Sequence, residues 1–301
     1  MDCVAVLRRG QVEVVEFRRL KKGDLVAIGR SEDGRDGIYV HIDAFSAPGS
    51  QEEAFSFRQS RSRETAYAMD YDSIYDLLRY EKRNGFITWV LGPACCFDWD
   101  ARHAFAKLVK GGYVNALLAG NALATHDLEA AYLHTALGQN IYTQESAPLG
   151  HYNHLDTINR VKYHGSIPAF LEKEHIDNGI LYQCVRCGVP FVLAGSIRDD
   201  GPLPEVYGNV YEAQDAMRAQ VRTATTVICM ATMLHTIATG NMTPSFRVLA
   251  DGTVRPVYFY CVDISEFAVN KLSDRGSLSA RGIVTNVQDF VVTLAKGLEI
   301  W

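Results

Sequence analysis

The stretch Tyr113-Val-Asn-Ala-Leu-Leu118, followed directly by Ala119-Gly-Asn121, decides the class of fold. It is a short apolar run that ends in Gly and Asn, and comparable runs recur at residues 86–91, 191–194, 226–230 and 257–262. Strands that are apolar along their whole length are buried on both faces, which is typical of a parallel sheet covered by helices. The pattern therefore predicts a buried parallel sheet.

The segments between these runs favour helices. Residues 71–83 have helical spacing, with Asp72 or Ser73 as the expected N-cap, and residues 100–110 fit a helix that Gly111-Gly112 ends. Strands and helices alternate from residue 85 onward. This alternation predicts an α/β fold with a Rossmann-like, doubly wound parallel sheet.

The first fifty residues follow a different pattern. Residues 11–17, 23–29 and 37–42 alternate with period two, and Asp-Gly pairs separate the last two of these segments. A polar segment containing Pro and Gly follows at residues 46–53. We expect a small β-rich N-terminal segment over residues 1–54 and a catalytic domain over residues 55–301.

The amino-acid composition argues against several classes of partner. The 301 residues carry 30 basic and 35 acidic side chains, a net charge of -5, which argues against nucleic acid as a partner. The 48% hydrophobic content suffices for a full core. No apolar run reaches the roughly 20 residues that span a bilayer, and the N-terminus does not resemble a secretory signal. We expect a cytoplasmic protein without a membrane partner.

The cysteines and paired histidines do not favour a metal site. Cys184 and Cys187 form the only CxxC pair among seven cysteines, and no second pair follows at a zinc spacing. Cysteines 95, 96, 229 and 261 lie in apolar stretches that are typical of core positions. His151 and His154 have helical spacing, but only Asp156 is a further ligand nearby. We expect no metal.

Candidate cofactor residues follow the strands, because ligands of doubly wound sheets bind outside the carboxyl ends of the strands. Asp263 ends the run at 257–262 and could bind the ribose diol of a dinucleotide or cap the next helix. No GxGxxG is present, so a pyrophosphate would need backbone N–H groups at a helix N-terminus. Suitable segments are 120–122, 231–235 and, less strongly, 285–287.

One loop and one histidine, His235, are candidates for the chemistry. The segment Ser196-Ile-Arg-Asp-Asp-Gly201 carries Arg198, which suits a carboxylate, and two adjacent carboxylates, which suit an amino group. A solvated charged turn is the alternative interpretation. His235 follows a buried strand, and His126 stands beside Asp127 near an expected helix start.

Four longer motifs carry a family resemblance. They are 112–129, Gly150-His-Tyr-Asn-His154, 191–204 (FVLAGSIRDDGPLP) and 233–242 (MLHTIATGNM). They resemble the archaeal-type NAD-dependent ornithine cyclodeaminases, also labelled LOR/SDH-related proteins, and the C-terminal region of arginine dihydrolases. The resemblance implies a deoxyhypusine-synthase-like NAD domain. The cofactor contacts that it implies are Asn121, Ala122, Asp200, Thr232, Met233, Leu234, His235, Asp263, Asn286 and Val287.

The activity implied by the resemblance is conversion of L-ornithine to L-proline and ammonia by transient storage of a hydride on NAD. Asp199, Asp200 and His235 are then the candidate general bases, and Arg198 would hold the substrate carboxylate. A homo-oligomer is also expected. Residues 94–97 read Ala-Cys-Cys-Phe where the family often has His-Thr, so another diamino acid is an alternative substrate. Further alternatives are a net amino-acid or opine-type dehydrogenase, an aminobutyl-transfer enzyme similar to deoxyhypusine synthase, and a non-catalytic NAD-binding protein.

Overall fold

The computed structural model describes residues 3–28, 68–249, 252–265, 267, 270–271 and 280–301. The chain divides into two compact units, Met1–Thr65 and Ala66–Trp301. The domain boundary expected between residues 54 and 55 lies outside the described residues.

The N-terminal unit contains a small antiparallel sheet. Strands β1 (Cys3–Arg8), β2 (Gln11–Glu16) and β3 (Leu25–Val26) pair in the order β2-β1-β3, and the short helix η1 (Phe17–Arg19) follows β2. Arg8 lies 2.7 Å from Asp24, Nη2 to Oδ2, which ties β1 to the turn before β3. The predicted β-rich character is confirmed for these strands, while the strand expected at 37–42 lies outside the described residues.

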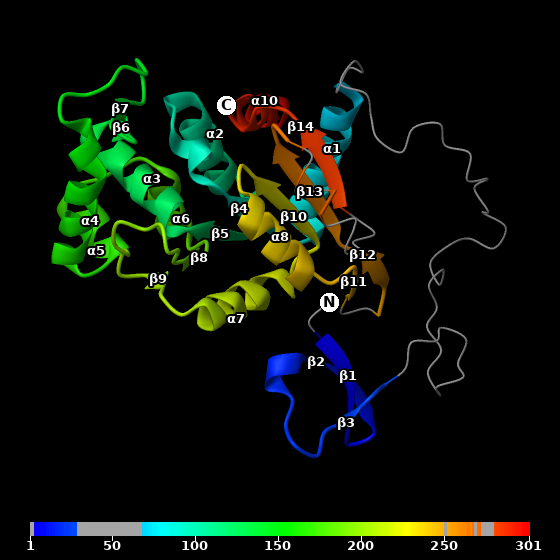
Figure 1. Cartoon of the computed structure of the whole chain (residues 1–301). Coiled ribbons are helices and arrows are strands. Elements are labelled where there is room, and N and C mark those ends of the chain that lie inside the picture. The colour runs from blue at the N-terminus through cyan, green and yellow to red at the C-terminus, as the bar shows by residue number, and fades with distance from the viewer. Residues whose placement is uncertain (1–2, 29–67, 250–251, 266, 268–269, 272–279) are drawn as a thin grey trace. The chain divides into compact units, whose positions relative to one another are not determined.

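The larger unit is built on a seven-stranded sheet in which every neighbouring pair is parallel (Figure 1). The spatial order is β14-β13-β10-β4-β5-β8-β9. From β4 the chain builds outward to β5, β8 and β9, and it then returns to the other side of β4 with β10. The predicted doubly wound sheet is confirmed, and its topological switch point lies between β4 and β10. The strands are β4 (Ile87–Leu91), β5 (Ala116–Gly120), β8 (Phe191–Ala194), β9 (Val206–Tyr207), β10 (Thr226–Met230), β13 (Tyr258–Asp263) and β14 (Ala280–Val284).

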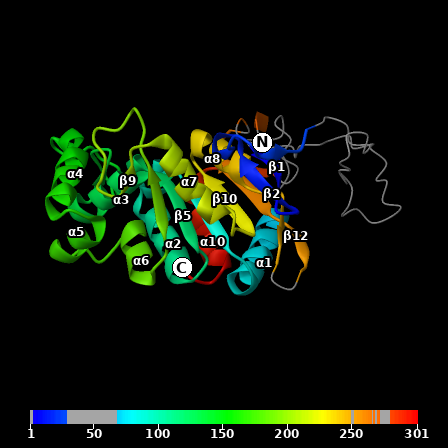
Figure 2. The same cartoon turned by 90° about the horizontal axis from the view of Figure 1, so that it is seen from below.

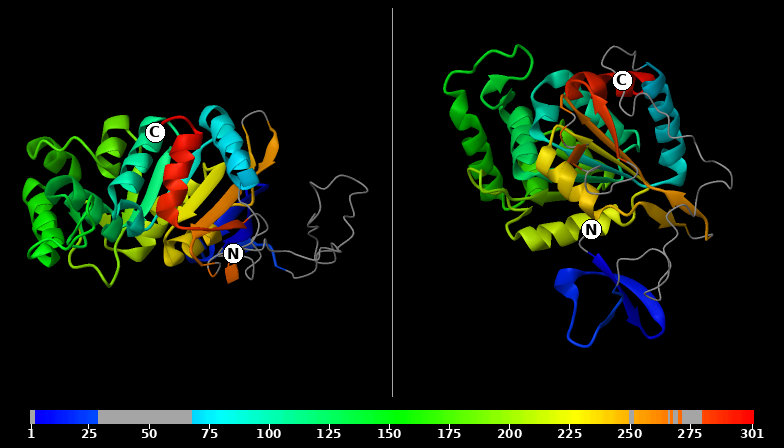
Figure 3. Two further views of the ribbon diagram at one scale, coloured as in Figure 1. Left: turned by 90° about the horizontal axis from the view of Figure 1, so that it is seen from above. Right: turned by 45° about the vertical axis from the view of Figure 1, so that its right-hand side comes forward.

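Helices cover both faces of this sheet (Figures 1 and 2). One layer contains α1 (Ala68–Asn84), α2 (Trp99–Lys110), α6 (Ile180–Cys187) and α10 (Val287–Gly297), and the other contains α7 (Val210–Val221) and α8 (Met233–Met242). Helices α3 (Asn121–Leu133), α4 (Asn153–His164) and α5 (Ile167–Lys173) form the end of the unit that lies away from α1 (Figure 3). Short elements complete it: η2 (Pro93–Cys96), η3 (Gly150–Tyr152), β6 (Thr135–Ala136), β7 (Gln139–Asn140), β11 (Phe246–Val248) and β12 (Val254–Pro256).

Two predicted boundaries are wrong. The strand expected at 113–118 begins at Ala116, because side chains replace part of the backbone pairing between the preceding residues and β4. Trp89 Nε1 donates to the Tyr113 carbonyl (2.8 Å), and Asn115 Oδ1 accepts from the Ile87 N–H (2.7 Å). Helix α1 begins at Ala68, before the expected N-caps Asp72 and Ser73. Both therefore lie inside the helix and do not cap it.

A buried ion pair fixes α3 between its neighbours. Arg102 of α2 donates through Nε to Asp127 of α3 (2.6 Å), and each side chain is only 1% exposed. The same carboxylate accepts from the backbone N–H groups of Ile180 and Leu181, at 3.0 and 2.8 Å, and so satisfies the start of α6. Because a buried charge is stable only with partners of this kind, Asp127 holds α3 in one position relative to α2 and α6.

The cysteines expected in the core, at 95, 96, 229 and 261, are buried. Burial raises the pKa of the Cys95 and Cys261 thiols to about 12. Of the CxxC pair, Cys184 is buried and Cys187 is exposed. Within the described part of the chain, no group of three His, Cys, Asp or Glu side chains is arranged to bind a metal ion. In the same part, no helix has the length and apolar character needed to cross a bilayer.

Candidate active site

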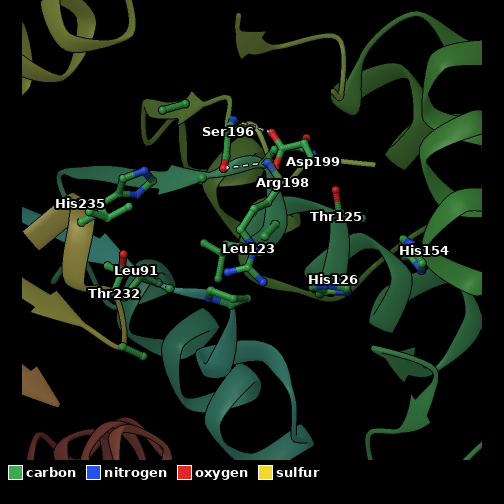
Figure 4. A pocket seen from close by; sticks show the side chains of 18 of the residues that line it. Leu91, Leu123, Thr125, His126, His154, Ser196, Arg198, Asp199, Thr232 and His235 are labelled. Atoms are coloured by element: carbon green, nitrogen blue, oxygen red, sulfur yellow. Dashed lines mark hydrogen bonds between the residues drawn. The ribbon is translucent and has the colours of Figure 1, made fainter. Parts of the chain in front are cut away.

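A cavity of about 560 Å³ lies at the carboxyl ends of β4, β5, β8 and β10 (Figure 4). Its walls are the turns that follow these strands, the first two turns of α3 and part of α4. This is where a doubly wound sheet binds its ligands. The lining residues are 91–93, 120–123, Thr125, His126, Leu137, His154, Ile158, Ala194, Ser196, 198–200 and 231–235.

A close backbone contact shapes the cavity at the switch point. Ala231, between β10 and α8, has a left-handed conformation with φ of 53°. Its carbonyl oxygen lies only 1.8 Å from where a Cβ on Gly92 would stand, so a side chain at position 92 is excluded. Glycine at this position lets the turn before α8 approach the end of β4. Strained backbone of this kind is concentrated at ligand sites.

Two helix N-termini present backbone N–H groups to the cavity. The residues that precede α3 and α8, Gly120 and Thr232, make no side-chain hydrogen bond to their helices. By contrast, Asn286 at the start of α10 accepts from the N–H groups of Gln288 and Asp289, at 2.8 and 3.3 Å. Helix N-termini bind phosphate through such N–H groups and the helix dipole. The starts of α3 and α8 therefore fit a dinucleotide pyrophosphate better than the start of α10.

Asn121 connects α3 to the loop after β8. Its Nδ2 donates to the Gly201 carbonyl (3.0 Å), and its Oδ1 accepts from the Leu203 N–H (3.0 Å). The side-chain amide is thus committed to holding the loop. This leaves the backbone of Asn121 and of its neighbour Ala122 as the part of the helix start that a ligand could contact.

His235 lies in the first turn of α8 and packs against the end of β5. Its Cε1 would be 3.1 Å from a Cβ on Gly120, so glycine there makes room for the imidazole. Burial lowers the pKa of His235, although the charge of Asp199 acts in the opposite direction. The ring is therefore neutral at neutral pH, with a nitrogen that can accept a proton.

The loop after β8 is stiffened by its own hydrogen bonds. Asp199 Oδ2 accepts from the Ser196 N–H (2.8 Å), and Ser196 Oγ accepts from the Arg198 N–H (3.2 Å). The Arg198 side chain extends from this loop into the cavity (Figure 4). Asp200 Oδ2 lies 3.0 Å from His154 Nε2 on α4. The loop is thus a wall of the cavity and not only a solvated turn.

Three of the predicted cofactor residues do not line the cavity: Asp263, Asn286 and Val287. Val262 of β13 pairs with Met230 of β10, and Asp263 is the next residue of β13. Asp263 therefore lies at the same edge of the sheet as the cavity, on the strand beside β10. Its Oδ1 accepts from the Ser265 N–H (3.2 Å), as expected from the alternative capping role. Val287 packs in the core and is 7% exposed.

The cavity also contains side chains that the sequence did not assign to it. His126 and His154 both line it, with ring centroids 6.1 Å apart. His126 bonds Glu129 and not its neighbour Asp127. Helical spacing is the signal that could have placed His126 here, since Ala122 and His126 are four residues apart and share one face of α3.

Comparisons with known proteins agree with this geometry. Residues 73–294 match the family described as "Arginine dihydrolase ArgZ-like, C-terminal, Rossmann fold". An ornithine cyclodeaminase of Methanopyrus kandleri is 39% identical over 99% of this chain and 69% of its own length. The crystal structure of a conserved putative LOR/SDH protein of Methanococcus maripaludis S2 has a TM-score of 0.88 and 38% identity, over 99% of this chain and 86% of that one.

A third comparison involves bound ligands. AgrE of Nostoc sp. is a bifunctional arginine dihydrolase/ornithine cyclodeaminase, and its structure has been solved as a ternary complex with ornithine and NAD+. The TM-score is 0.69 and the identity 31%, over 99% of this chain and 40% of AgrE. The chain thus spans less than half of that bifunctional protein.

Proposed function

Because this chain belongs to the family of ArgZ-like C-terminal Rossmann-fold domains, we propose that it binds NAD and converts L-ornithine to L-proline and ammonia. The observation that carries the proposal is the cavity at the switch point, where two uncapped helix N-termini face a loop that bears Arg198, Asp199 and Asp200. The site therefore combines groups for a dinucleotide with groups for a small amino acid.

NAD would be held at the carboxyl edge of the sheet. The N–H groups at Asn121 and Ala122, and at residues 233–235 after Thr232, suit the pyrophosphate. Asp263, one strand further, suits the ribose diol through the oxygen that Ser265 does not use. Asn286 and Val287 would contribute through their backbone, since the Asn286 side chain caps α10 and Val287 is buried.

The remaining residues would hold the substrate and move its protons. Arg198 extends into the cavity and suits the ornithine carboxylate. His235 is neutral because burial lowers its pKa, so it can accept a proton from an ammonium group, as can Asp200. NAD, when bound, supplies reversible oxidation of the amino-bearing carbon. Holding both amines of one molecule in the cavity gives ring closure the advantage of an intramolecular reaction.

Turnover of L-ornithine tests the proposal directly. The purified chain with catalytic NAD should release one proline and one ammonia for each ornithine consumed, with no net NADH. Stoichiometric NADH would indicate a net dehydrogenase. NAD binding without turnover of ornithine would move the question to other diamino acids.

The cellular setting is part of the same proposal. We expect a cytoplasmic homo-oligomer that contributes to proline biosynthesis from arginine-derived ornithine. The fully exposed Ile197, between Ser196 and Arg198 at the cavity, is an apolar side chain that a neighbouring subunit could cover. Light scattering of the purified chain gives the oligomeric state.

A further inference from the structure

Glu129, in the third turn of α3, is a fully buried carboxylate that accepts hydrogen bonds on both oxygens. Oε1 accepts from Thr135 Oγ1 (2.7 Å) and the Gly138 N–H (3.2 Å), and Oε2 accepts from the Leu137 N–H (3.2 Å). Asn153 Nδ2 donates to Thr135 Oγ1 (2.8 Å), which directs the hydroxyl proton toward Glu129. All three partners are donors, so Glu129 acts purely as an acceptor here.

The fourth neighbour of this carboxylate is His126, whose Nδ1 lies 2.8 Å from Oε2. A purely accepting carboxylate places the imidazole proton on Nδ1. Nε2 then carries the free lone pair, and it makes no hydrogen bond to any residue that the structure describes. The Phe97 ring packs edge-on against the imidazole at 5.8 Å and 72°. The tautomer and the orientation of His126 are therefore both held by its surroundings.

His126 differs in this respect from the other imidazoles of the cavity. The Nε2 of His154 is engaged by Asp200, whose side chain is 64% exposed. His235 packs against Gly120, and no carboxylate is hydrogen-bonded to its ring among the described residues. His126 alone combines a fully buried carboxylate behind the ring with a ring that lines the cavity. The charged and titratable groups that share the cavity with it are Arg198, Asp199, Asp200, His154 and His235.

We infer that His126 is a further catalytic residue of this site and that Glu129 is its positioning residue, an inference that rests on the proposed function. Nε2 of His126 accepts one proton from the ammonium group of the substrate, which frees the nitrogen lone pair, while Nδ1–H stays on Glu129. Nε2 later returns that proton to the nitrogen that leaves as ammonia. The second ammonium group of ornithine loses its proton to another base of the cavity, His235 or Asp200, and this proton leaves with the ammonia as ammonium. The His126 ring is neutral before and after the cycle.

Three variants test the pair. His126→Asn keeps an N–H group that can reach Glu129 but removes the basic nitrogen Nε2. Glu129→Gln keeps the shape of the carboxylate and removes its charge. The matched control is His164→Asn, which breaks a similar imidazole–carboxylate contact, with Glu174 at 2.7 Å, in a part of α4 that does not line the cavity.

The expected result separates chemistry from binding. In His126→Asn, kcat for ornithine should fall by roughly 10²- to 10⁴-fold, the usual contribution of a general acid–base group. In Glu129→Gln it should fall by about 10- to 100-fold, as for removal of an orienting carboxylate. The KM for ornithine, from steady-state kinetics, should stay close to the wild-type value in both variants. The Kd for NAD, measured by calorimetry, should also stay close to the wild-type value in both variants. His164→Asn should match wild type throughout.

Nitrogen NMR of the histidine-labelled, NAD-free protein provides a readout that does not need turnover. It should report the Nδ1–H tautomer for His126 in the wild type and a mixture in Glu129→Gln. An Nε2–H tautomer in the wild type overturns the inference even if Glu129→Gln does not fold. Normal kcat in His126→Asn, in a protein that turns over ornithine, also overturns it and leaves the proposed function intact. Absence of ornithine turnover in the wild type instead removes the proposed function.

Discussion

His154 on α4 and Asp200 in the loop after β8 both line the cavity and contact each other, with 3.0 Å between Nε2 and Oδ2. The two residues are 46 positions apart in the sequence. Their contact places a carboxylate beside the space that a substrate would occupy and ties the loop to the helical end of the unit. Asp200 therefore has a defined position, although its side chain is 64% exposed.

Replacement of this carboxylate tests its role. Asp200→Asn keeps the volume and the contact with His154 but removes the charge, so ornithine turnover should fall by about 10²-fold or more. The melting temperature should change little, because the side chain is largely exposed. Asp156→Asn, an exposed position in the first turn of α4, is the control. Wild-type turnover in Asp200→Asn would favour the alternative interpretation of this loop as a solvated charged turn.

Asp263 should determine the choice between NAD and NADP. A carboxylate that binds the ribose diol would repel the 2′-phosphate of NADP, so NAD should bind more tightly. Asp263→Ala should weaken NAD binding by about 10- to 100-fold, the loss expected for hydrogen bonds to a charged group. Asp76→Ala, an exposed position on α1, should leave the affinity unchanged. Calorimetric titration gives both affinities, and equal binding of NADP would remove Asp263 from this role.

An isotope experiment tests the redox balance of the reaction. Ornithine deuterated at the carbon that is oxidised should give proline that keeps the label, because the same hydride leaves and returns while the cofactor stays bound. Mass spectrometry of the product measures the retention. Loss of the label to water would argue against hydride storage, and transfer of the label into free NADH would favour a net dehydrogenase.

Gly92 should tolerate no side chain. The Cβ of Gly92→Ala would lie 1.8 Å from the Ala231 carbonyl oxygen, so the turn before α8 must move. We expect a loss of about 1–3 kcal/mol in the free energy of unfolding, as for other overpacked sites, together with weaker NAD binding. Gly208→Ala is the matched control, because no atom lies within 4 Å of its Cβ position. Denaturant unfolding measures the stability of both variants. Equal free energies of unfolding for Gly92→Ala and Gly208→Ala would contradict the expectation.

The sequence by itself determined five of the seven strands of the sheet and the edge at which the candidate site lies, but it did not indicate the edge strands β9 and β14. The runs at β4, β10 and β13 are mostly apolar, and this local pattern favours burial on both faces. The residues that follow the strands, such as Asn121 and His235, could be identified for the same reason. The strand ends of a parallel sheet gather at one edge, so a list of strand ends is already a list of site candidates.

Only the tertiary structure decided which partner each polar side chain takes. Asn121 bonds the loop at Gly201 and Leu203, some 80 residues away, and His126 bonds Glu129 rather than the adjacent Asp127, which Arg102 occupies. A polar residue has several possible partners, and the choice depends on the path of segments that are distant in the sequence. Local patterns carry no information about that path, because hydrogen bonding is short-ranged and directional, whereas burial of apolar residues requires no particular partner.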